Sequence, residues 1–200
     1  QIESISEKEF GQLLEKARQD TSVLRAVEQQ TSELLAQSTV TLQTERRFVV
    51  NSFLALHVVK DLLKAKGAAN FGFANCMGHD VISMLDTPPC LVLSLANDEG
   101  FTAYCHTDLS HTLPGVLLRW IAGKPTFVCN SHFPHHGIFT VAHCAAPRRM
   151  NGREYEPARI MTHFESDYGA ATKVQYTKDQ LVTAIIPNLR CTKWQGFKGR

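Results

Sequence analysis

Imidazole and thiol side chains are concentrated in one stretch of this sequence. Seven of the nine histidines fall between His106 and His163. Three of the six cysteines lie in or directly beside the same stretch, in the pairs Cys105-His106, Cys129-Asn130 and His143-Cys144. Each pair ends or follows a short apolar run, so we expect these side chains at the ends of buried strands. Clustered imidazoles held this way suit a metal site or a proton-transfer site.

The first candidate motif is Cys105-His-Thr-Asp108, between an expected strand and an expected helix. His106 lies just beyond the strand, where its side chain can face a crevice and act as a ligand or a general base. Asp108 can assist as a carboxylate. The alternatives are an exposed turn histidine for His106 and a helix N-cap for Asp108.

The second candidate is Asn130, which follows an expected strand, can donate and accept hydrogen bonds, and offers a neutral oxygen to a hard metal. Its alternative role is to form a turn. The histidines of the next loop could bind a transition metal, but their polar surroundings favour a solvated loop. They are His132, His135 and His136.

Two more motifs place a histidine after an apolar run. His143-Cys144 follows one such run, and His163 follows another, with Glu165 two residues later. Burying a histidine is costly without polar partners. A carboxylate beside an imidazole can relay protons or bind sugar hydroxyls. The alternatives are a buried His143 paired with backbone groups and a strand-end turn around His163.

The elements that must position these side chains divide into two parts. Apolar residues at helical spacing predict helices at 6–18, 22–37 and 44–66, with Gly67 ending the third. The following stretch alternates short apolar runs with one helical run, 109–122. Its expected strands are 69–76, 90–95, 101–105 and 126–129.

The C-terminal part predicts further strands separated by turn residues. These strands are 138–143, 159–163, 171–176 and 181–186. We therefore expect an α/β fold, with a parallel α/β layer and N-terminal helices, followed by a β-rich, barrel-like portion. The expected domains are 1–125 and 126–200, and the end of the chain reads as a cut within the second domain.

Composition restricts the partners. The chain is 44% hydrophobic and 20% charged, with a net charge of +2 and dispersed basic residues, so we expect no nucleic-acid partner. No apolar run approaches the ~20 residues of a membrane span, and we see no signal peptide. The cysteines show no CxxC spacing, which favours reduced thiols in a cytoplasmic protein, with disulfides as the alternative.

Several short motifs together resemble the L-fucose isomerase-like family, which is related to L-arabinose isomerase. The resemblance covers about residues 46–200. It rests on Asn75-Cys-Met, Pro89-Cys-Leu, Leu95-Ala-Asn-Asp-Glu-Gly100, Cys105-His-Thr-Asp108, Ala122-Gly-Lys-Pro-Thr-Phe127, Ala142-His-Cys-Ala-Ala-Pro147 and Thr162-His-Phe-Glu-Ser166.

The resemblance implies aldose–ketose isomerisation of a monosaccharide through a metal-stabilised enediolate, in a homo-oligomer. It implies metal ligands at His106, Asn130 and His143, with Mn²⁺ as the family's cation. His106 and Asn130 stand where the family has carboxylates, so Zn²⁺ or no metal are alternatives. A further family ligand is expected beyond Arg200.

The expected catalytic residues are His106, Asp108 and Glu165, and the expected substrate-binding residues are Asn130 and His163. The carboxylates missing from the metal positions leave a second hypothesis, a catalytically degenerate homologue that binds carbohydrate or regulates. A third is that this segment serves only as a scaffold within an assembly.

Overall fold

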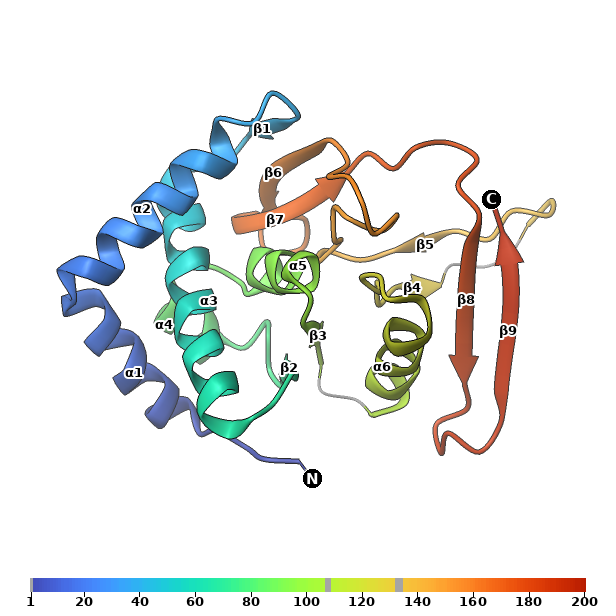
Figure 1. Cartoon of the computed structure of the whole chain (residues 1–200), viewed down its shortest axis with the longest axis horizontal. Helices are drawn as coiled ribbons and strands as arrows, with labels where there is room; N and C mark the ends of the chain where they lie inside the picture. Colours follow the sequence, from blue (N-terminus) through green and yellow to red (C-terminus); the bar gives the residue numbers. More distant parts are fainter. Residues whose placement is uncertain (1, 107–108, 132–134) are drawn as a thin grey trace.

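The N-terminal third forms three helices, as predicted. The computed structural model describes residues 2–106, 109–131 and 135–200. The helices are α1 (Glu7–Gln19), α2 (Thr21–Leu35) and α3 (Arg46–Lys66), which lie together on one side of the molecule (Figure 1). Asp20 caps α2 by accepting hydrogen bonds from the backbone N–H groups of Ser22 and Val23. Gly67 ends α3 in the left-handed conformation with φ 61°, which confirms its predicted role.

Helix α3 is the centre of the core. It packs against α1, α2 and α5 (Cys90–Glu99), and also against a strand from the C-terminal part, β7 (Tyr168–Val174). Its buried side chains lie on most of its circumference, because neighbours cover it on several sides. They include Phe48, Val49, Phe53, Leu56 and Val59.

A three-stranded sheet joins a strand from the N-terminal part of the chain to two strands from its C-terminal part. It has the order β1-β6-β7, where β1 is Val40–Leu42 and β6 is Ala158–His163. Strand β1 pairs with β6 in parallel, and β6 pairs with β7 antiparallel. The sheet thus connects the two predicted domains, 1–125 and 126–200, whose division stays a prediction.

The expected parallel layer is not confirmed, because only one pair of the described strands in the stretch where it was expected is parallel. Strands β2 (Asn70–Phe73) and β3 (Thr102–Cys105) pair in parallel, and α4 (His79–Leu85) and α5 connect them. The run 126–129, predicted as a strand, lies outside the ladders. After it, β4 (Asn130–Ser131) pairs antiparallel with β5 (Val141–Ala142). The chain therefore has a mixed α/β architecture in which the described strands form several small sheets.

The prediction of a strand at 90–95 is wrong, because this run forms the first part of α5. The helix is buried on nearly every side, so its apolar residues show no helical periodicity in the sequence. Pro89 precedes the helix, and Gly100 ends it with φ 107°. A fully buried helix and a buried strand give the same local pattern.

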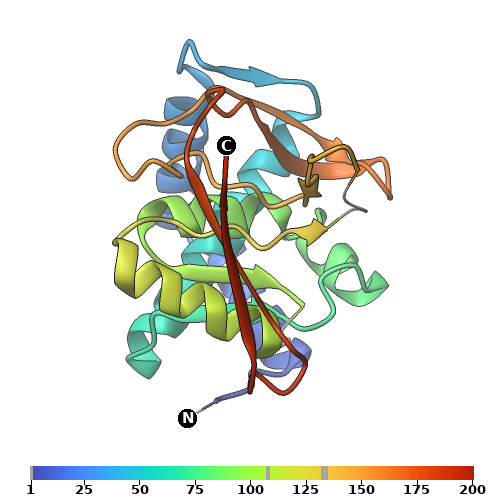
Figure 2. The same cartoon turned by 90° about the vertical axis from the view of Figure 1, so that its right-hand side faces the viewer.

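The barrel-like expectation for the C-terminal portion also fails over the described residues. Strands β8 (Val182–Pro187) and β9 (Trp194–Gly199) form a two-stranded antiparallel hairpin that pairs with no other described strand. The hairpin lies at the far end from α1 and α2 and crosses in front of α6 (Leu109–Ala122) (Figures 1 and 2). An isolated hairpin cannot close a barrel, since closure requires continuous pairing around the sheet.

Helix α6 confirms the helix predicted at 109–122 and packs against β3 and β8. Its contact with β3 depends on Gly115, because a Cβ atom there would lie 1.8 Å from the Tyr104 hydroxyl oxygen. The close approach fixes α6 beside the strand that ends at Cys105. None of the described helices has both the length and the apolar character that crossing a membrane requires.

Candidate metal site

The parallel pairing of β2 and β3 brings the first group of donors together. The register places Phe73 opposite Cys105, so both strands end at the same edge. Cys76 lies in the turn after β2, and His106 follows β3 with φ 52°. That left-handed conformation is uncommon for a residue with a Cβ atom. This conformation changes the direction of the chain directly after the strand.

Cys76, Cys105 and His106 form this first group. Their donor atoms all lie within 4.8 Å of one another, and Cys76 Sγ lies 3.9 Å from His106 Nε2. Both cysteines are only 3% exposed, whereas His106 is exposed. The group therefore has a buried sulfur side and a side that faces solvent.

A second group consists of Cys90, Cys144 and His163, whose donor atoms also lie within 4.8 Å of one another. The two sulfurs are 3.3 Å apart. His163 is 2% exposed, with its Nδ1 3.3 Å from Ser166 Oγ and its Nε2 3.8 Å from Glu165 Oε2. Helix α5, the segment after β5 and the end of β6 thus converge here.

His143 lies between the two groups. Its Nε2 is 3.1 Å from Cys105 Sγ, and its Nδ1 is 3.5 Å from Cys144 Sγ. One imidazole ring therefore contacts a sulfur of each group. We call the seven residues the Cys–His cluster: Cys76, Cys90, Cys105, His106, His143, Cys144 and His163.

The hydrogen bonds of the cluster shift the pKa values of its thiols in opposite directions. The thiols of Cys105 and Cys90, together with the adjacent His143, hold the pKa of Cys144 far below its usual range. Hydrogen bonding to Cys144 in turn raises the pKa of His143 and of Cys90, and burial adds to the effect on Cys90.

The first group also pairs a thiol of lowered pKa with a thiol of raised pKa. The hydrogen bond from Cys105, with the nearby His106, lowers the pKa of Cys76 to about 6. Sharing its proton with Cys144 and Cys76 raises the pKa of Cys105. Each group therefore contains one thiol that ionises easily, and thiolates are the form in which cysteine binds metals.

Four residues predicted from the sequence lie in or beside the cluster: His106, His143, His163 and Glu165. Asn130 is exposed on β4, opposite Ala142 in the strand register, so its backbone lies near the residue that precedes His143. Asp108 and the loop residue His132 lie outside the described residues. His135 and His136 are exposed in the loop before β5.

No local pattern in the sequence marks the four cysteines of the cluster as ligands. Cys76 and Cys90 lie far from the histidine-rich stretch and show no paired spacing. The available signal was the direct adjacency in Cys105-His106 and His143-Cys144, which places a thiol beside an imidazole at two strand ends.

The donors fit some metals and not others. Manganese prefers oxygen ligands, whereas the cluster offers sulfur and nitrogen, so the cation implied by the resemblance does not fit these residues. Thiolate and imidazole are the usual ligands of zinc. All six cysteines are free thiols in the structure.

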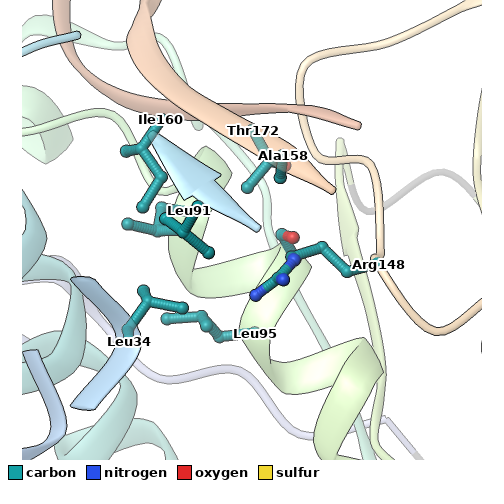
Figure 3. A pocket seen from close by; sticks show the side chains of 9 residues that line it. Leu34, Leu91, Leu95, Arg148, Ala158, Ile160 and Thr172 are labelled. Atoms are coloured by element: carbon teal, nitrogen blue, oxygen red, sulfur yellow. The ribbon is translucent and has the colours of Figure 1, made fainter. Parts of the chain in front are cut away.

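A small cavity elsewhere is a packing feature. Figure 3 shows Arg148 reaching into a cavity lined mainly by apolar side chains, including Leu34, Leu91 and Ile160. None of the seven cluster residues lines it. The cavity therefore lies beside the buried Arg148 side chain and does not belong to the candidate site.

Searches for related proteins found no family model, no curated protein and no solved structure that matches this chain. The resemblance to sugar isomerases therefore stays a prediction based on short motifs.

Proposed function

We propose that the protein interconverts an aldose and a ketose at the Cys–His cluster. The observation that carries this proposal is the convergence of the motifs behind the resemblance. Cys105-His106, His143-Cys144 and His163 lie far apart in the sequence, yet their side chains meet in one place. Convergence of titratable groups is typical of catalytic sites.

Isomerisation requires a proton to move between two neighbouring carbons of the sugar. The base removes the proton from the carbon beside the aldehyde, and the electron pair forms an enediol with the carbonyl carbon. The same proton returns to the former aldehyde carbon, while a hydroxyl proton moves between the two oxygens. Substrate and product are isomers, so no external oxidant or reductant takes part.

Glu165 and His163 are the residues we assign to this proton transfer. The exposed Glu165 carboxylate can reach a bound sugar, and its Oε2 lies 3.8 Å from Nε2 of the buried His163. Ser166 Oγ lies 3.3 Å from His163 Nδ1 and orients the ring. A carboxylate backed by a fixed imidazole can accept a proton and return it.

A panel of pentoses and 6-deoxyhexoses tests the proposal. We expect aldose–ketose conversion by the wild-type protein, and a loss of about 10²–10⁴-fold in rate for Glu165→Gln. The matched control is Glu154→Gln, at an exposed carboxylate outside the cluster, which should keep the wild-type rate. Failure of the wild-type protein to convert any sugar of the panel would contradict the proposal.

The second candidate is a homologue that binds carbohydrate without converting it. Two points favour it: the resemblance puts His106 and Asn130 where the family has carboxylates, and Asn130 is exposed on β4. This hypothesis predicts sugar binding by calorimetry without turnover. It also predicts that His106→Glu combined with Asn130→Asp creates activity. Turnover by the unaltered protein would exclude it.

From the family resemblance alone we further infer a homo-oligomer, and from the free thiols we infer that it works in the reducing cytoplasm. A cluster with four free thiols would oxidise in a compartment that forms disulfides. Light scattering of the purified chain tests the oligomer, and a monomer at all concentrations would contradict it.

A further inference from the structure

We propose that Cys76, Cys105 and His106 bind a zinc ion and leave one coordination position open to solvent. The site goes beyond the isomerase proposal, because it is argued from the donor atoms alone. Three protein ligands and one open position are the pattern of catalytic zinc sites.

The spacing of the donors fits a tetrahedral ion. Zinc binds sulfur at about 2.3 Å and imidazole nitrogen at about 2.0–2.1 Å, so neighbouring ligand atoms lie about 3.5–3.8 Å apart. Cys76 Sγ and His106 Nε2 are 3.9 Å apart, and all three donors lie within 4.8 Å of one another. Shifts of at most about 1 Å between donor atoms would complete the coordination.

The fold holds these donors before an ion arrives. Cys105 ends β3 and is fixed by its pairing with β2, while Cys76 occupies the turn after β2. The Asn75 side chain packs closely against Gly78, which follows that turn, because a Cβ atom at Gly78 would lie 2.1 Å from Asn75 Nδ2. The turn is therefore closely packed, and the ion would bind a largely prepared site.

Burial and exposure are distributed as a reactive metal site requires. The two sulfurs are buried and can offset the ion's charge as thiolates, while the exposed His106 leaves one side accessible. His143 Nε2, 3.1 Å from Cys105 Sγ, can donate a hydrogen bond to that sulfur and orient it.

The second group is a weaker candidate for the same ion. Its histidine is buried and already has Ser166 and Glu165 as partners. Its two cysteines lie 3.3 Å apart in a more enclosed position, without an exposed donor. We therefore assign the ion to the first group.

Soft donors select the metal. Two thiolates and an imidazole favour Zn²⁺ or Co²⁺ over Mn²⁺ and Mg²⁺. The structure thus assigns this chain a cation that differs from the one implied by the isomerase resemblance.

The test measures binding of Zn²⁺, Co²⁺ and Mn²⁺ to the purified chain under reducing conditions. We expect one tightly bound Zn²⁺, a thiolate-to-cobalt charge-transfer band with Co²⁺, and no binding of Mn²⁺ at equal concentration. Absence of the charge-transfer band in the wild-type protein would overturn the proposal, whether or not any variant folds.

Three variants locate the ion: Cys76→Ser, Cys105→Ser and His106→Asn, where asparagine tolerates the positive φ. Loss of an outer partner weakens metal affinity by about 10–100-fold, so loss of a ligand should weaken it by at least about 100-fold. Cys129→Ser and Cys191→Ser are matched controls outside the cluster and should bind as the wild type does. Loss of zinc in Cys90→Ser with full binding in Cys76→Ser would overturn the assignment.

Failure of this inference is distinguishable from failure of the proposed function. Zinc binding without isomerisation would leave the site standing and contradict the isomerase. Isomerisation by a protein that binds no zinc would support the isomerase and contradict the zinc site.

Discussion

Two buried polar regions of this molecule differ in how their charged and polar atoms find partners. One surrounds Arg148, between α2, α5 and the start of β6, and the other is the Cys–His cluster. In the first, acceptors from the chain itself surround the guanidinium. In the second, cysteine sulfurs and histidine nitrogens, all of them atoms that can bind a metal, lie close to one another.

Each guanidinium nitrogen of Arg148 has an acceptor within the chain. Arg148 is 3% exposed, yet its Nε, Nη1 and Nη2 atoms donate to Glu156 O, Gln37 Oε1 and Thr39 Oγ1 at 3.0–3.2 Å. Asp98 accepts hydrogen bonds from the backbone N–H groups of Arg148 and Arg149. Buried charges satisfied in this way are typical of structural networks.

The cluster has fewer partners outside its own residues. His163 contacts Ser166 and Glu165, but the other thiols and imidazoles contact mainly one another, at 3.1–3.9 Å, over sequence separations of up to 54 residues. Metal ligands have this arrangement, since the ion supplies the missing opposite charge. Convergence of cysteine sulfurs and histidine nitrogens, more than burial of polar groups, is therefore the feature that points to a functional site.

The largest effect should come from breaking the arginine region. Arg148→Met removes the guanidinium and leaves its three acceptors, Glu156 O, Gln37 Oε1 and Thr39 Oγ1, without that donor. We expect the free energy of unfolding to fall by about 3–5 kcal/mol, measured by urea denaturation. Zinc binding should survive wherever the variant is folded. A loss below about 1 kcal/mol would show that the network is not structural.

Removal of zinc should have the next largest effect. Because the ion binds the folded chain, chelation should reduce the free energy of unfolding by about 3–4 kcal/mol relative to zinc at 100–1,000 times its dissociation constant. Thermal denaturation with and without chelator measures this change. The variant Cys76→Ser should show no response to chelator, whereas Cys191→Ser should respond as the wild type does.

A pH dependence separates the two regions further. Burial raises the pKa of Asp98 to about 6, above the ordinary value of 3.8. The contribution of this carboxyl group to stability is therefore greatest below pH 3.8 and is lost as the pH rises through about 6.

The variant Asp98→Asn cannot titrate. Relative to it, we expect the wild type to lose on the order of 2–3 kcal/mol between pH 4 and pH 7. Urea denaturation of both proteins at the two pH values measures the difference. A wild type that gains stability relative to the variant over this range would contradict the assignment.

The smallest effect should come from the packing beside the cluster. Gly115→Ala forces a methyl group against Tyr104 and should cost about 1–3 kcal/mol. The displacement of α6 from β3 should also weaken zinc binding modestly, because Cys105 ends that strand. Ala122→Ser, at the exposed end of α6, is a control that should leave both stability and zinc binding unchanged.

The sequence predicts the helical part of this fold better than its sheets. Helices α1, α2 and α3 follow from apolar periodicity and from caps such as Gly67. Helix α5 was predicted as a strand because burial on all sides removes the periodicity. Strand β9 gives no apolar run, since most of its residues are exposed.

The candidate site was predicted in part for a related reason. Local motifs identified His106, His143 and His163, because each histidine follows a short apolar run. Cys105 and Cys144 adjoin these histidines, but the other two cysteines are distant: Cys76 is 30 residues from His106, and Cys90 is 54 residues from Cys144. Only the pairing of β2 with β3 and the packing of α5 bring them together.

The most direct test of zinc binding by the first group of the Cys–His cluster is an anomalous diffraction measurement at the zinc edge, on crystals grown with Zn²⁺. We predict an anomalous peak bonded to Cys76 Sγ, Cys105 Sγ and His106. The absence of a peak at these three donors, with the chain folded as described, would contradict the account.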